Sequence, residues 1–264
     1  MAEEPVVLFE KHGHIAVFTL NRPKAMNAIS GAVSEQFEAH LETFEADDEL
    51  WIGIVESSHP KTFCAGADLK SLNKGENVQT MKGGFAGMVA FPRKKPLIAA
   101  VDGNALAGGC EIVLACDMVV ASKKAVFGVP EVKRSLIPGA GGLFRLPQKI
   151  PRAIAMELML TGDPISCERA YQVGLVNHIA EEGRENVMKA AMALAERITV
   201  NAPLAVREAK ACVDEFGQAA LKDEDAFNRS VQGMGMVMQT PDFMEGTGAF
   251  IQKRAPKWTG KSKL

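Results

Sequence analysis

The sequence predicts an α/β protein in which strands and helices alternate up to about residue 200 and helices alone follow. Apolar and polar side chains alternate through the first twenty residues, as they do in half-buried strands. Two glycine-rich loops, FCAGAD at 63–68 and LAGGCE at 106–111, each lead into a helical pattern. Beyond about residue 183 no further strand pattern occurs. Together these observations define the fold class.

The N-terminal elements are expected to be a hairpin and a helix. Residues 6–10 and 14–20 alternate on either side of a His-Gly pair, which predicts a β-hairpin. A polar loop at 21–30 follows, and Ser30 is placed to cap a helix. Apolar side chains then recur at helical spacing, at Val33, Phe37, Leu41 and Phe44.

The same succession of elements is repeated further along the chain. Residues 51–57 predict a short apolar strand, and the loop 58–68 opens a helix near Asp68. A variable segment rich in Gly, Lys and Met covers 71–91. A buried strand at 97–103 then leads into the second glycine-rich loop and its helix.

The last part of the alternating region contains three more predicted strands. Two of them cover 116–122 and 125–131, and a glycine-rich turn then enters a helix within 137–150. Another helix begins after Pro151, and residues 175–180 form the last strand. In the helix that begins after Pro151, the side chains expected to point inward are Ile154, Leu158 and Met159.

Four helical stretches follow the last strand. Their breaks lie near Ala202-Pro203, Gly217 and Thr240-Pro241. These stretches have too few apolar faces to form a core among themselves. We therefore expect a core domain at 1–200 and a helical region at 201–264 that docks on this core or on another subunit.

The composition is that of an ordinary globular protein, with 47% hydrophobic and 23% charged residues. A net charge of −2 and a pI near 6.2 give no basic field for nucleic acid or anionic lipid, and the cluster Arg93-Lys94-Lys95 is too short to change this. The N-terminal MAEEPVV lacks the apolar stretch of a signal peptide, and no apolar run approaches the ~20 residues of a membrane span. We therefore expect a cytoplasmic protein with neither nucleic acid nor membrane as a partner.

The five cysteines are an odd number and include no C-x-x-C pair. A disulfide framework or zinc knuckle is therefore not expected, and the thiols are predicted to be reduced and mostly buried. The chain ends in Ser262-Lys263-Leu264, the tripeptide that directs proteins to peroxisomes. In a eukaryote the expected compartment is therefore the peroxisome.

Motifs of several common enzyme classes are absent from the sequence. There is no G-x-S-x-G, no G-x-x-x-x-G-K-[ST] and no G-x-G-x-x-G after a strand. The five histidines include no H-x-x-x-H pair, so no metal site is predicted.

The two glycine-rich loops each present unhindered backbone N–H groups near a helix N-terminus. Two such donors that converge on one point would form an oxyanion hole for a carbonyl oxygen. The residues alone leave a second interpretation open, in which the glycines only allow tight turns or close helix packing.

Two glutamates lie in apolar surroundings, Glu111 in LAGGCEIVLACD and Glu131 in AVFGVPE. A buried carboxylate costs several kcal/mol unless it is paired, hydrogen-bonded or protonated. No cation lies within a helical turn of Glu111, whereas Glu131 could form a salt bridge with Lys133 or Arg134. Alternatively, two carboxylates around one water could serve as base and acid in a hydration.

These residues lie in segments that resemble the crotonase superfamily, specifically the enoyl-CoA hydratases. The resemblance covers nearly the whole chain, through TLNRPKAMNAIS, KTFCAGADLKSL, KKPLIAAVDGNALAGGCEIVLACD, FGVPEVKRSLIPGAGG, LMLTGDPISCERAYQVGLVNHI and GTGAFIQKRAPKW. It implies a superhelix of repeated ββα units and a C-terminal helical region that builds trimers, often paired into hexamers. The implied partners are therefore an acyl-CoA thioester and further copies of the chain.

The resemblance also implies roles for particular residues. The backbone N–H groups of Ala67 and Gly108 would form the oxyanion hole, and Glu111 and Glu131 would be catalytic. The wall around the CoA moiety would include Lys24, Ala25, Met26, Ala65, Asp68, Leu69 and Lys70. Gly139 would offer a backbone N–H to the reacting water. No separate cofactor is expected, because CoA is part of the substrate.

The implied reaction is the reversible addition of water to a trans-2-enoyl-CoA, a step of fatty-acid β-oxidation that gives a 3-hydroxyacyl-CoA. By resemblance, Glu111 activates the water and Glu131 delivers a proton to C2. The two N–H donors hold the enolate oxygen that forms in between. Two coupled carboxylates leave this division of roles open.

Several positions depart from the typical short-chain hydratases. Ala107 stands where a third glycine is usual, Asn104 where an apolar side chain is common, and Arg134 where small residues are frequent. The segment GLFRLP also stands where the typical short-chain hydratases have a segment that contains Thr-Gln. These features are closer to carnitinyl-CoA dehydratases, and they leave the length and polarity of the acyl group open.

Two further alternatives come from the same superfamily. A Δ3,Δ2-enoyl-CoA isomerase would use the same oxyanion hole, but isomerases often lack a carboxylate at the position of Glu111. A non-enzymatic member would bind a CoA thioester or RNA without turnover. The predicted helix at 31–50 has many acids and no lysine, which argues against RNA, and an inactive member would more often have lost a glutamate. Hydration is therefore the favoured activity.

Overall fold

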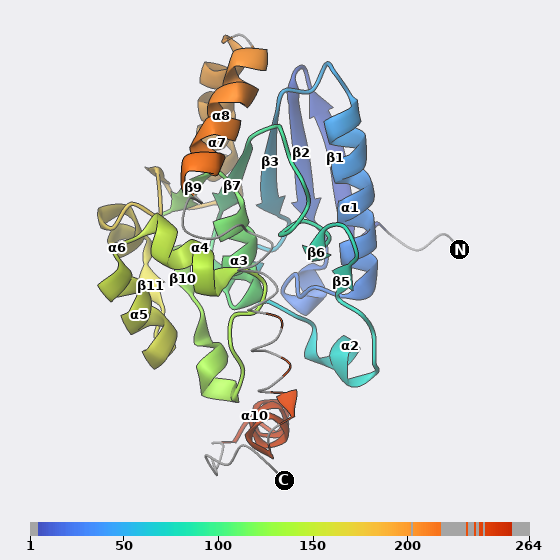
Figure 1. Ribbon diagram of the computed structural model, residues 1–264, viewed down its shortest axis with the longest axis vertical. Helices are drawn as coiled ribbons and strands as arrows, with labels where there is room; N and C mark the ends of the chain where they lie inside the picture. The colour runs from blue at the N-terminus through green and yellow to red at the C-terminus, as the bar shows by residue number, and fades with distance from the viewer. Residues whose placement is uncertain are drawn as a thin grey trace.

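The computed structural model describes residues 5–201, 203–217, 231, 235, 238–239 and 241–254. One set of strands comprises β1 (Val7–His12), β2 (Ile15–Leu20), β3 (Ile52–Ser57), β7 (Leu97–Val101), β9 (Met118–Ser122) and β12 (His178–Ala180). They form a six-stranded sheet in the order β1-β2-β3-β7-β9-β12 (Figure 1). Only β1 and β2 pair antiparallel in this sheet, as the predicted hairpin, and the other neighbours are parallel.

The shorter strands build two smaller sheets in the described part of the chain. They are β4 (Thr62–Cys64), β5 (Gln79–Thr80), β6 (Gly84–Phe85), β8 (Asn104–Leu106), β10 (Val126–Gly128) and β11 (Ile165–Ser166). A four-stranded sheet has the order β11-β10-β8-β4, and β5 pairs with β6.

Helices connect and cover these sheets. They are α1 (Gly31–Ala46), α2 (Leu69–Asn73), α3 (Gly108–Ala115), α4 (Gly142–Lys149), α5 (Arg152–Thr161), α6 (Cys167–Gln172), α7 (Arg184–Thr199), α8 (Pro203–Gly217) and α10 (Pro241–Ile251). Two 3-10 helices, η1 (Pro23–Ala25) and η2 (Pro130–Arg134), complete the described elements. None of the helices in the described ranges has the length and apolar character needed to cross a lipid bilayer.

The chain repeats one unit three times, as the family resemblance implied. The successive units are β3-β4-α2, β7-β8-α3 and β9-β10-η2. In each unit the first strand joins the six-stranded sheet and the second strand joins the four-stranded sheet. Because equivalent strands of successive units pair in parallel, the loops that follow them stack at one edge. This superhelix of ββα units confirms the predicted fold.

Several local predictions need correction. The loops predicted at 58–68 and after residue 103 contain the strands β4 and β8, which are too short at three residues each to show an alternating pattern. The strand predicted at 125–131 ends at Gly128, because Pro130 begins η2. Glu131 therefore lies on a 3-10 helix and not at a strand end.

The segment at 71–91 is more structured than its composition indicated. It contains the β5–β6 hairpin and a group of buried apolar side chains. These side chains are Val78, Phe85, Met88, Val89 and Phe91. The strand β11 and the helix α6 fill the region between α5 and β12, for which the sequence pattern made no prediction.

Both faces of the six-stranded sheet are covered, so its central strands are buried on both sides, including polar residues such as Thr19 and Glu56. All six residues of β2 are buried. On one face α7 contributes Val187, Ala191 and Ala195, spaced four residues apart, against Ile52 and Ile54 of β3. On the other face α1 packs aromatic side chains against β2. The helix predicted from Ser30 is thus confirmed as a core helix, with Ser30 at its N-cap position but without a capping hydrogen bond from its side chain.

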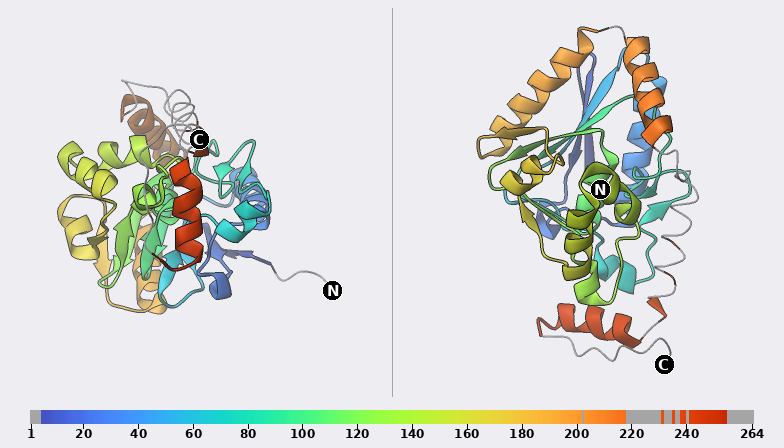
Figure 2. Two further views of the ribbon diagram at one scale, coloured as in Figure 1. Left: turned by 90° about the horizontal axis from the view of Figure 1, so that it is seen from below. Right: turned by 60° about the vertical axis from the view of Figure 1, so that its left-hand side comes forward.

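The remaining helices also follow the predicted breaks. In α5, Leu158 and Met159 are buried as predicted, and Ile154 is partly buried against the same core. Helix α8 begins at Pro203 and ends at Gly217, and α10 begins at Pro241. Figures 1 and 2 show α7 and α8 at one end of the molecule and α10 at the other.

Some sequence predictions fall on residues outside the described ranges. They concern most of the helical stretch between 217 and 240 and the C-terminal Ser262-Lys263-Leu264. The division into a core at 1–200 and a subunit-binding helical region at 201–264 stays a prediction. Four of the cysteines, Cys64, Cys110, Cys116 and Cys167, are buried free thiols, as predicted.

Candidate active site

The two predicted oxyanion loops meet in the folded protein. A Cβ atom built on Gly66 would lie 3.2 Å from Gly108 N and 3.0 Å from Ala107 Cβ. A Cβ atom built on Gly109 would lie only 2.1 Å from Cys64 O. Both loops therefore need glycine for close packing, and this packing brings the backbone next to Ala67 against that of Gly108.

The backbone geometry leaves both predicted donors available. In the short parallel bridge between Ile29 and Ala67, Ile29 N donates to Gly66 O and Asp68 N donates to Ile29 O, each at 2.8 Å. The N–H of Ala67 itself therefore lies on the opposite side of its strand. Gly108 is the first residue of α3, where the N–H has no acceptor within the helix.

Glu111 lies in the first turn of α3 and is only 3% exposed. Its Oε1 accepts hydrogen bonds from Ala140 N at 2.7 Å and from Gly142 N at 2.8 Å. Gly142 is the first residue of α4 and Ala140 lies in the turn before it, so both donors are at a helix N-terminus, where backbone N–H groups and the helix dipole favour an anion. A carboxylate in this apolar helix is therefore satisfied by a neighbouring helix and not by a cation on its own segment.

The surroundings of Glu111 still favour its protonated form. Burial raises its pKa from 4.5 to about 7, although the two backbone hydrogen bonds and the charge of Arg145 act in the opposite direction. At neutral pH the carboxyl group is therefore divided between its ionised and protonated forms.

Glu131 lies on η2 and is 9% exposed. Its Oε2 is buried and has no hydrogen-bond partner among the described residues. Burial, and secondly the negative charge of Glu111, raises its pKa well above the ordinary value. The charge of Glu111 therefore acts on the carboxyl group of Glu131, which supports the predicted pairing of the two residues.

The alternative of a structural salt bridge at Glu131 is not supported. Lys133 pairs with Asp163 instead. The guanidinium group of Arg134 donates to Lys133 O at 2.8 Å and stacks over the ring of Phe250, with 5.1 Å between Arg134 Cζ and the ring centroid. In the described residues, no cation neutralises Glu131.

The predicted donor Gly139 differs from the donors that the structure identifies at Glu111. The N–H groups that bind this carboxylate are those of Ala140 and Gly142, one and three residues further on. Gly139 itself is partly buried in the turn that precedes α4. A contact of Gly139 with the reacting water stays a prediction.

The predicted CoA-binding residues come from two adjacent segments. Lys24 and Ala25 lie in η1, and Met26 follows with a left-handed backbone at φ 51°. Ala65 N donates to Met26 O at 3.2 Å, which joins this turn to the first glycine-rich loop. The side chain of Met26 is 54% exposed. The geometry therefore presents a partly apolar, accessible edge next to the predicted oxyanion loop.

Asp68 has a structural function of its own. Its Oδ1 caps α2 by accepting from Lys70 N at 3.0 Å and Ser71 N at 3.3 Å, and its Oδ2 pairs with Arg22 Nη2 at 3.0 Å. Burial opposes ionisation of this group, but Arg22 and the backbone donors together lower its pKa. The cap begins α2 at Leu69, so the predicted binding residues at 68–70 follow the oxyanion loop without a gap. Sequence reasoning missed Arg22, which sits in the quoted NRP motif.

A second missed residue is Phe85 of β6. A Cβ atom built on Gly108 would lie 2.5 Å from both Cε1 and Cζ of this ring. Phe85 therefore forms a wall directly against the second oxyanion loop, and it is buried. No sequence signal distinguished it within the variable segment.

The site has the chemistry of an acid–base centre. Two neighbouring carboxyl groups with raised pKa values can take up and deliver protons near neutral pH. In the described ranges, no three side chains of His, Cys, Asp or Glu are grouped to hold a metal ion. A ββα superhelix with two facing glycine-rich loops and this carboxyl pair defines the class of the protein as crotonase-like.

Comparison with known proteins gives the family. Residues 10–261 match the family described as Enoyl-CoA hydratase/isomerase. The short-chain-enoyl-CoA hydratase of Clostridium acetobutylicum is 36% identical over 94% of this chain and 95% of its own length. The carnitinyl-CoA dehydratase of Citrobacter koseri is 36% identical over 96% of this chain and 98% of its own. The chain therefore belongs to the enoyl-CoA hydratase/isomerase family.

A solved structure agrees with this assignment. The carnitinyl-CoA hydratase from Mycobacterium avium superposes with a TM-score of 0.91 at 41% sequence identity, over 98% of this chain and 100% of that one. The agreement extends over the whole fold and is not confined to the site.

Proposed function

We propose that this protein is an enoyl-CoA hydratase, a hydro-lyase that adds water reversibly to a trans-2-enoyl-CoA. The observation that supports this most directly is the carboxyl pair. Glu111 is held by the backbone N–H groups of Ala140 and Gly142, and Oε2 of Glu131 is buried without a hydrogen-bond partner in the described chain. A protein with only a structural use for these residues would neutralise both. Acid–base catalysis explains why they are kept protonatable.

The proposed reaction uses each group in turn. The thioester oxygen of the substrate accepts hydrogen bonds from the N–H groups of Ala67 and Gly108, which stabilise an enolate. The ionised Glu111 takes a proton from water while the oxygen of that water bonds to C3. The protonated Glu131 then gives its proton to C2, and the product is a 3-hydroxyacyl-CoA. Glu111 ends protonated and Glu131 ionised, so a proton must pass between them, directly or through solvent, before the next turnover.

The two environments support this division of roles. Glu111 has backbone donors that favour its anion, so it is the better base. Glu131 has no such donors besides its own backbone, and the charge of Glu111 favours its protonated form, so it is the better acid. Because the two groups are coupled, their titration belongs to the pair.

We propose a CoA site on the segments around η1 and α2, with Lys24 and Lys70 as exposed cations beside Met26 and Ala65. The cap and ion pair of Asp68 hold these segments together. CoA enters as part of the substrate, so no further cofactor is required.

The nature of the acyl group separates two candidates. A short apolar chain would make the protein a short-chain hydratase, and a polar chain would make it a carnitinyl-CoA dehydratase-type enzyme. Relatives with either name are 36% identical to this chain, and a carnitinyl-CoA hydratase structure is 41% identical. An isomerase is less consistent with the site, because isomerisation does not require the carboxylate at Glu111.

We further propose that the protein assembles as a trimer or a hexamer through residues 201–264. Exposed apolar side chains on the described helices of this region support it, namely Val213, Met244, Phe250 and Ile251. We propose a cytoplasmic location, or a peroxisomal one if the terminal tripeptide is recognised in a eukaryotic cell. Sedimentation velocity would give the number of subunits.

Hydration of crotonyl-CoA by the purified protein tests the proposed activity. The loss of the enoyl-thioester absorbance is followed for the wild type and for Glu111→Gln, Glu131→Gln and Glu35→Gln. We expect each active-site variant to lose about 10²- to 10⁴-fold in kcat. The exposed Glu35 on α1 provides the matched control, and its variant should retain wild-type turnover.

The other outcomes of this assay are also informative. Turnover of a carnitinyl-type thioester but not of crotonyl-CoA would select the polar substrate. Binding of CoA thioesters without any hydration would point to an isomerase or to a binding protein. Full activity of either active-site variant would contradict the two-carboxylate mechanism.

A further inference from the structure

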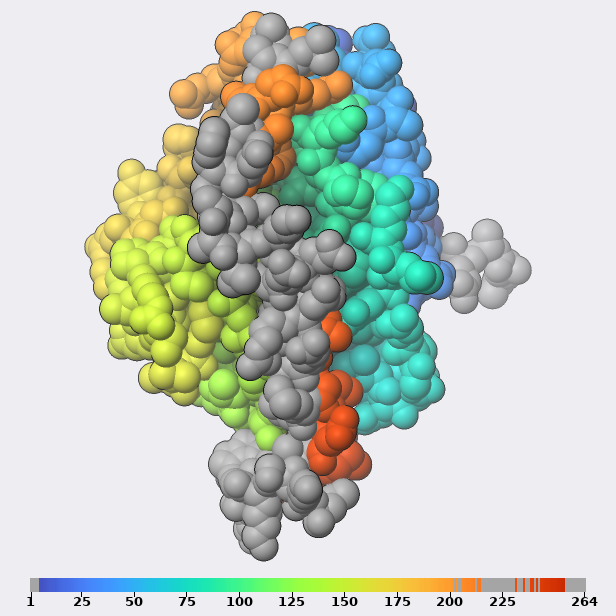
Figure 3. All heavy atoms as spheres, viewed as in Figure 1, coloured from blue at the N-terminus to red at the C-terminus, as the bar shows by residue number. Residues whose placement is uncertain are grey.

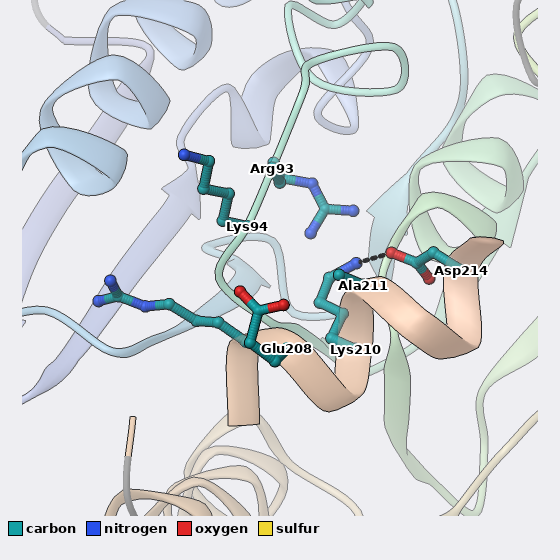
Figure 4. A pocket seen from close by; sticks show the side chains of 7 residues that line it. Arg93, Lys94, Glu208, Lys210, Ala211 and Asp214 are labelled. Carbon is teal, nitrogen blue, oxygen red and sulfur yellow. Dashed lines mark hydrogen bonds and ion pairs between the residues drawn. The ribbon is translucent and has the colours of Figure 1, made fainter. Parts of the chain in front are cut away.

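A charged cavity lies away from the carboxyl pair. It has a volume of about 310 Å³ and lies between α8 and the segment that leads into β7 (Figure 4). Six charged side chains line it, and we call it the α8 cavity: Arg93, Lys94, Arg207, Glu208, Lys210 and Asp214. Figure 3 shows α8 (orange) and this segment (green) side by side near the upper end of the molecule.

The α8 cavity and the candidate active site lie at opposite ends of β7. Arg93 and Lys94 precede the strand, whereas the loop with Gly108 follows it. The five residues of β7 span about 17 Å. The side chains that line the cavity include neither the carboxyl pair nor residues of the oxyanion loops.

Part of the positive charge in the cavity is already neutralised. Lys210 pairs with Asp214 at 2.5 Å and with Asp117 at 3.0 Å, and Arg93 pairs with Asp117 at 3.4 Å. Figure 4 shows the guanidinium group of Arg93 directed toward Lys210 and Asp214. These contacts form one network between α8 and the strands β7 and β9.

The remaining positive charge has no counterpart. Among the described residues, neither Arg207 nor Lys94 forms an ion pair, and Arg207 Nε is buried without a hydrogen-bond acceptor. The neighbouring Lys95 is fully buried and donates to two backbone carbonyls. Burial, and secondly the charge of Arg207, lowers the pKa of Lys95. Arg207 thus lies near a second buried cation and lacks an anion.

The charge balance of the cavity favours an anionic ligand. Four cations line it against the carboxylates of Glu208 and Asp214. Even with Asp117 counted, positive charge exceeds negative charge by one. An arginine with a free Nε–H offers the planar donor geometry that phosphate oxygens accept, and a lysine adds a point charge. A volume of about 310 Å³ is at the lower limit of small-molecule sites.

We propose that the α8 cavity binds a phosphate group, either as inorganic phosphate or as part of a small phosphorylated molecule, through Arg207 and Lys94. The negative charge of the ligand would balance the excess positive charge between α8 and the start of β7. This site is separate from the substrate site, and it does not depend on the hydratase activity.

Isothermal titration of the full-length protein with inorganic phosphate and with pyrophosphate, at constant ionic strength, tests the proposal. We expect binding by the wild type and a loss of affinity of about tenfold or more in Arg207→Met. Lys94→Met should weaken binding as well. Arg197→Met and Lys189→Met remove equivalent charges from exposed positions on α7 and should bind like the wild type.

A variant that removes a negative charge from the cavity keeps the proposal testable if Arg207→Met is poorly folded. Glu208→Gln removes the one lining carboxylate without an ion pair in the described chain, and it should strengthen binding several-fold. Absence of binding by the wild type would overturn the proposal. Equal affinity of the wild type and of a folded Arg207→Met would also overturn it, because the phosphate would then occupy another site.

Discussion

Replacing Glu111 by glutamine should stabilise the protein in a pH-dependent way while it abolishes the proposed activity. Burial raises the pKa of Glu111 to about 7 in the folded chain, from an ordinary value of 4.5. The folded protein therefore holds this proton to a higher pH than the unfolded chain does. With respect to this group, stability is greatest below pH 4.5, falls as the pH rises towards 7, and is constant above that.

The size of the effect follows from the two pKa values. A change from 4.5 to about 7 corresponds to about 3 kcal/mol of destabilisation by the ionised form. Glutamine is neutral at every pH, and its side-chain oxygen can still accept from the N–H groups of Ala140 and Gly142. The variant should therefore gain about 3 kcal/mol over the wild type between pH 5 and pH 8, or roughly 6–12 °C in Tm.

Thermal unfolding between pH 5 and pH 8 measures this difference directly. The quantity of interest is the Tm of Glu111→Gln minus that of the wild type at each pH. Glu35→Gln on the exposed face of α1 is the control, and its difference should not change with pH. If the Tm difference between Glu111→Gln and the wild type stays constant across this pH range, the folded protein does not raise the pKa of Glu111, and the reasoning is refuted.

Glu131 also affects the stability that is gained by replacing Glu111. The charge of Glu111 contributes to the raised pKa of Glu131, so removing that charge brings the pKa of Glu131 down. The double variant Glu111→Gln/Glu131→Gln should therefore gain less at pH 8 than the sum of the single variants. Additive effects would mean that the two groups are not coupled.

Substitutions at Ala107, Gly109 and Asp68 test the loops of the site by thermal unfolding. Ala107→Gly should raise stability by about 1 kcal/mol, because Ala107 adopts φ 52°, whereas Ala193→Gly inside α7 should lower it by about as much. Gly109→Ala should cost about 1–3 kcal/mol, since the new Cβ would lie 2.1 Å from Cys64 O and would force α3 away from β4. Asp68→Ala should cost about 1 kcal/mol through loss of the α2 cap, and Asp68→Asn should cost less because an amide oxygen still caps the helix.

Opposite results would contradict the geometry in each case. A lower Tm for Ala107→Gly would mean that the methyl group stabilises the loop by more than its backbone strain costs. A wild-type Tm for Gly109→Ala would mean that α3 and β4 are not in contact. Equal losses of stability for the two substitutions at Asp68 would mean that Asp68 stabilises the protein through its ion pair with Arg22 and not through the cap.

The sequence anticipated the important side chains better than their partners. Glu111 and Glu131 were identified because a carboxylate in an apolar run is costly, and this cost depends only on local composition. The donors that hold Glu111 lie 29 and 31 residues away, at the start of α4 and in the turn before it, so no local pattern could indicate them. Gly139, the predicted donor to the reacting water, is adjacent to Ala140 in the chain, and that contact stays a prediction.

Residues that act through shape were the hardest to predict. Phe85 lies in a segment without clear periodicity, and its contact with Gly108 depends on the β5–β6 hairpin. The strand β8 and the 3-10 helix that bears Glu131 are each set by a few residues and their neighbours in the sheet. Short elements have too little sequence to reveal a period, so tertiary pairing decides them.

By itself the sequence determined the alternation of strands and helices, the positions of the glycine-rich loops and the presence of two costly carboxylates. These properties follow from hydrophobic period, backbone freedom and desolvation, all of which act over a few residues. Only the tertiary structure decided that Gly66 meets Gly108, that Ala140 and Gly142 supply the N–H groups for Glu111, and that Oε2 of Glu131 has no partner in the described chain. Those facts depend on how successive turns of the superhelix stack, which is a property of distances through space and not along the chain.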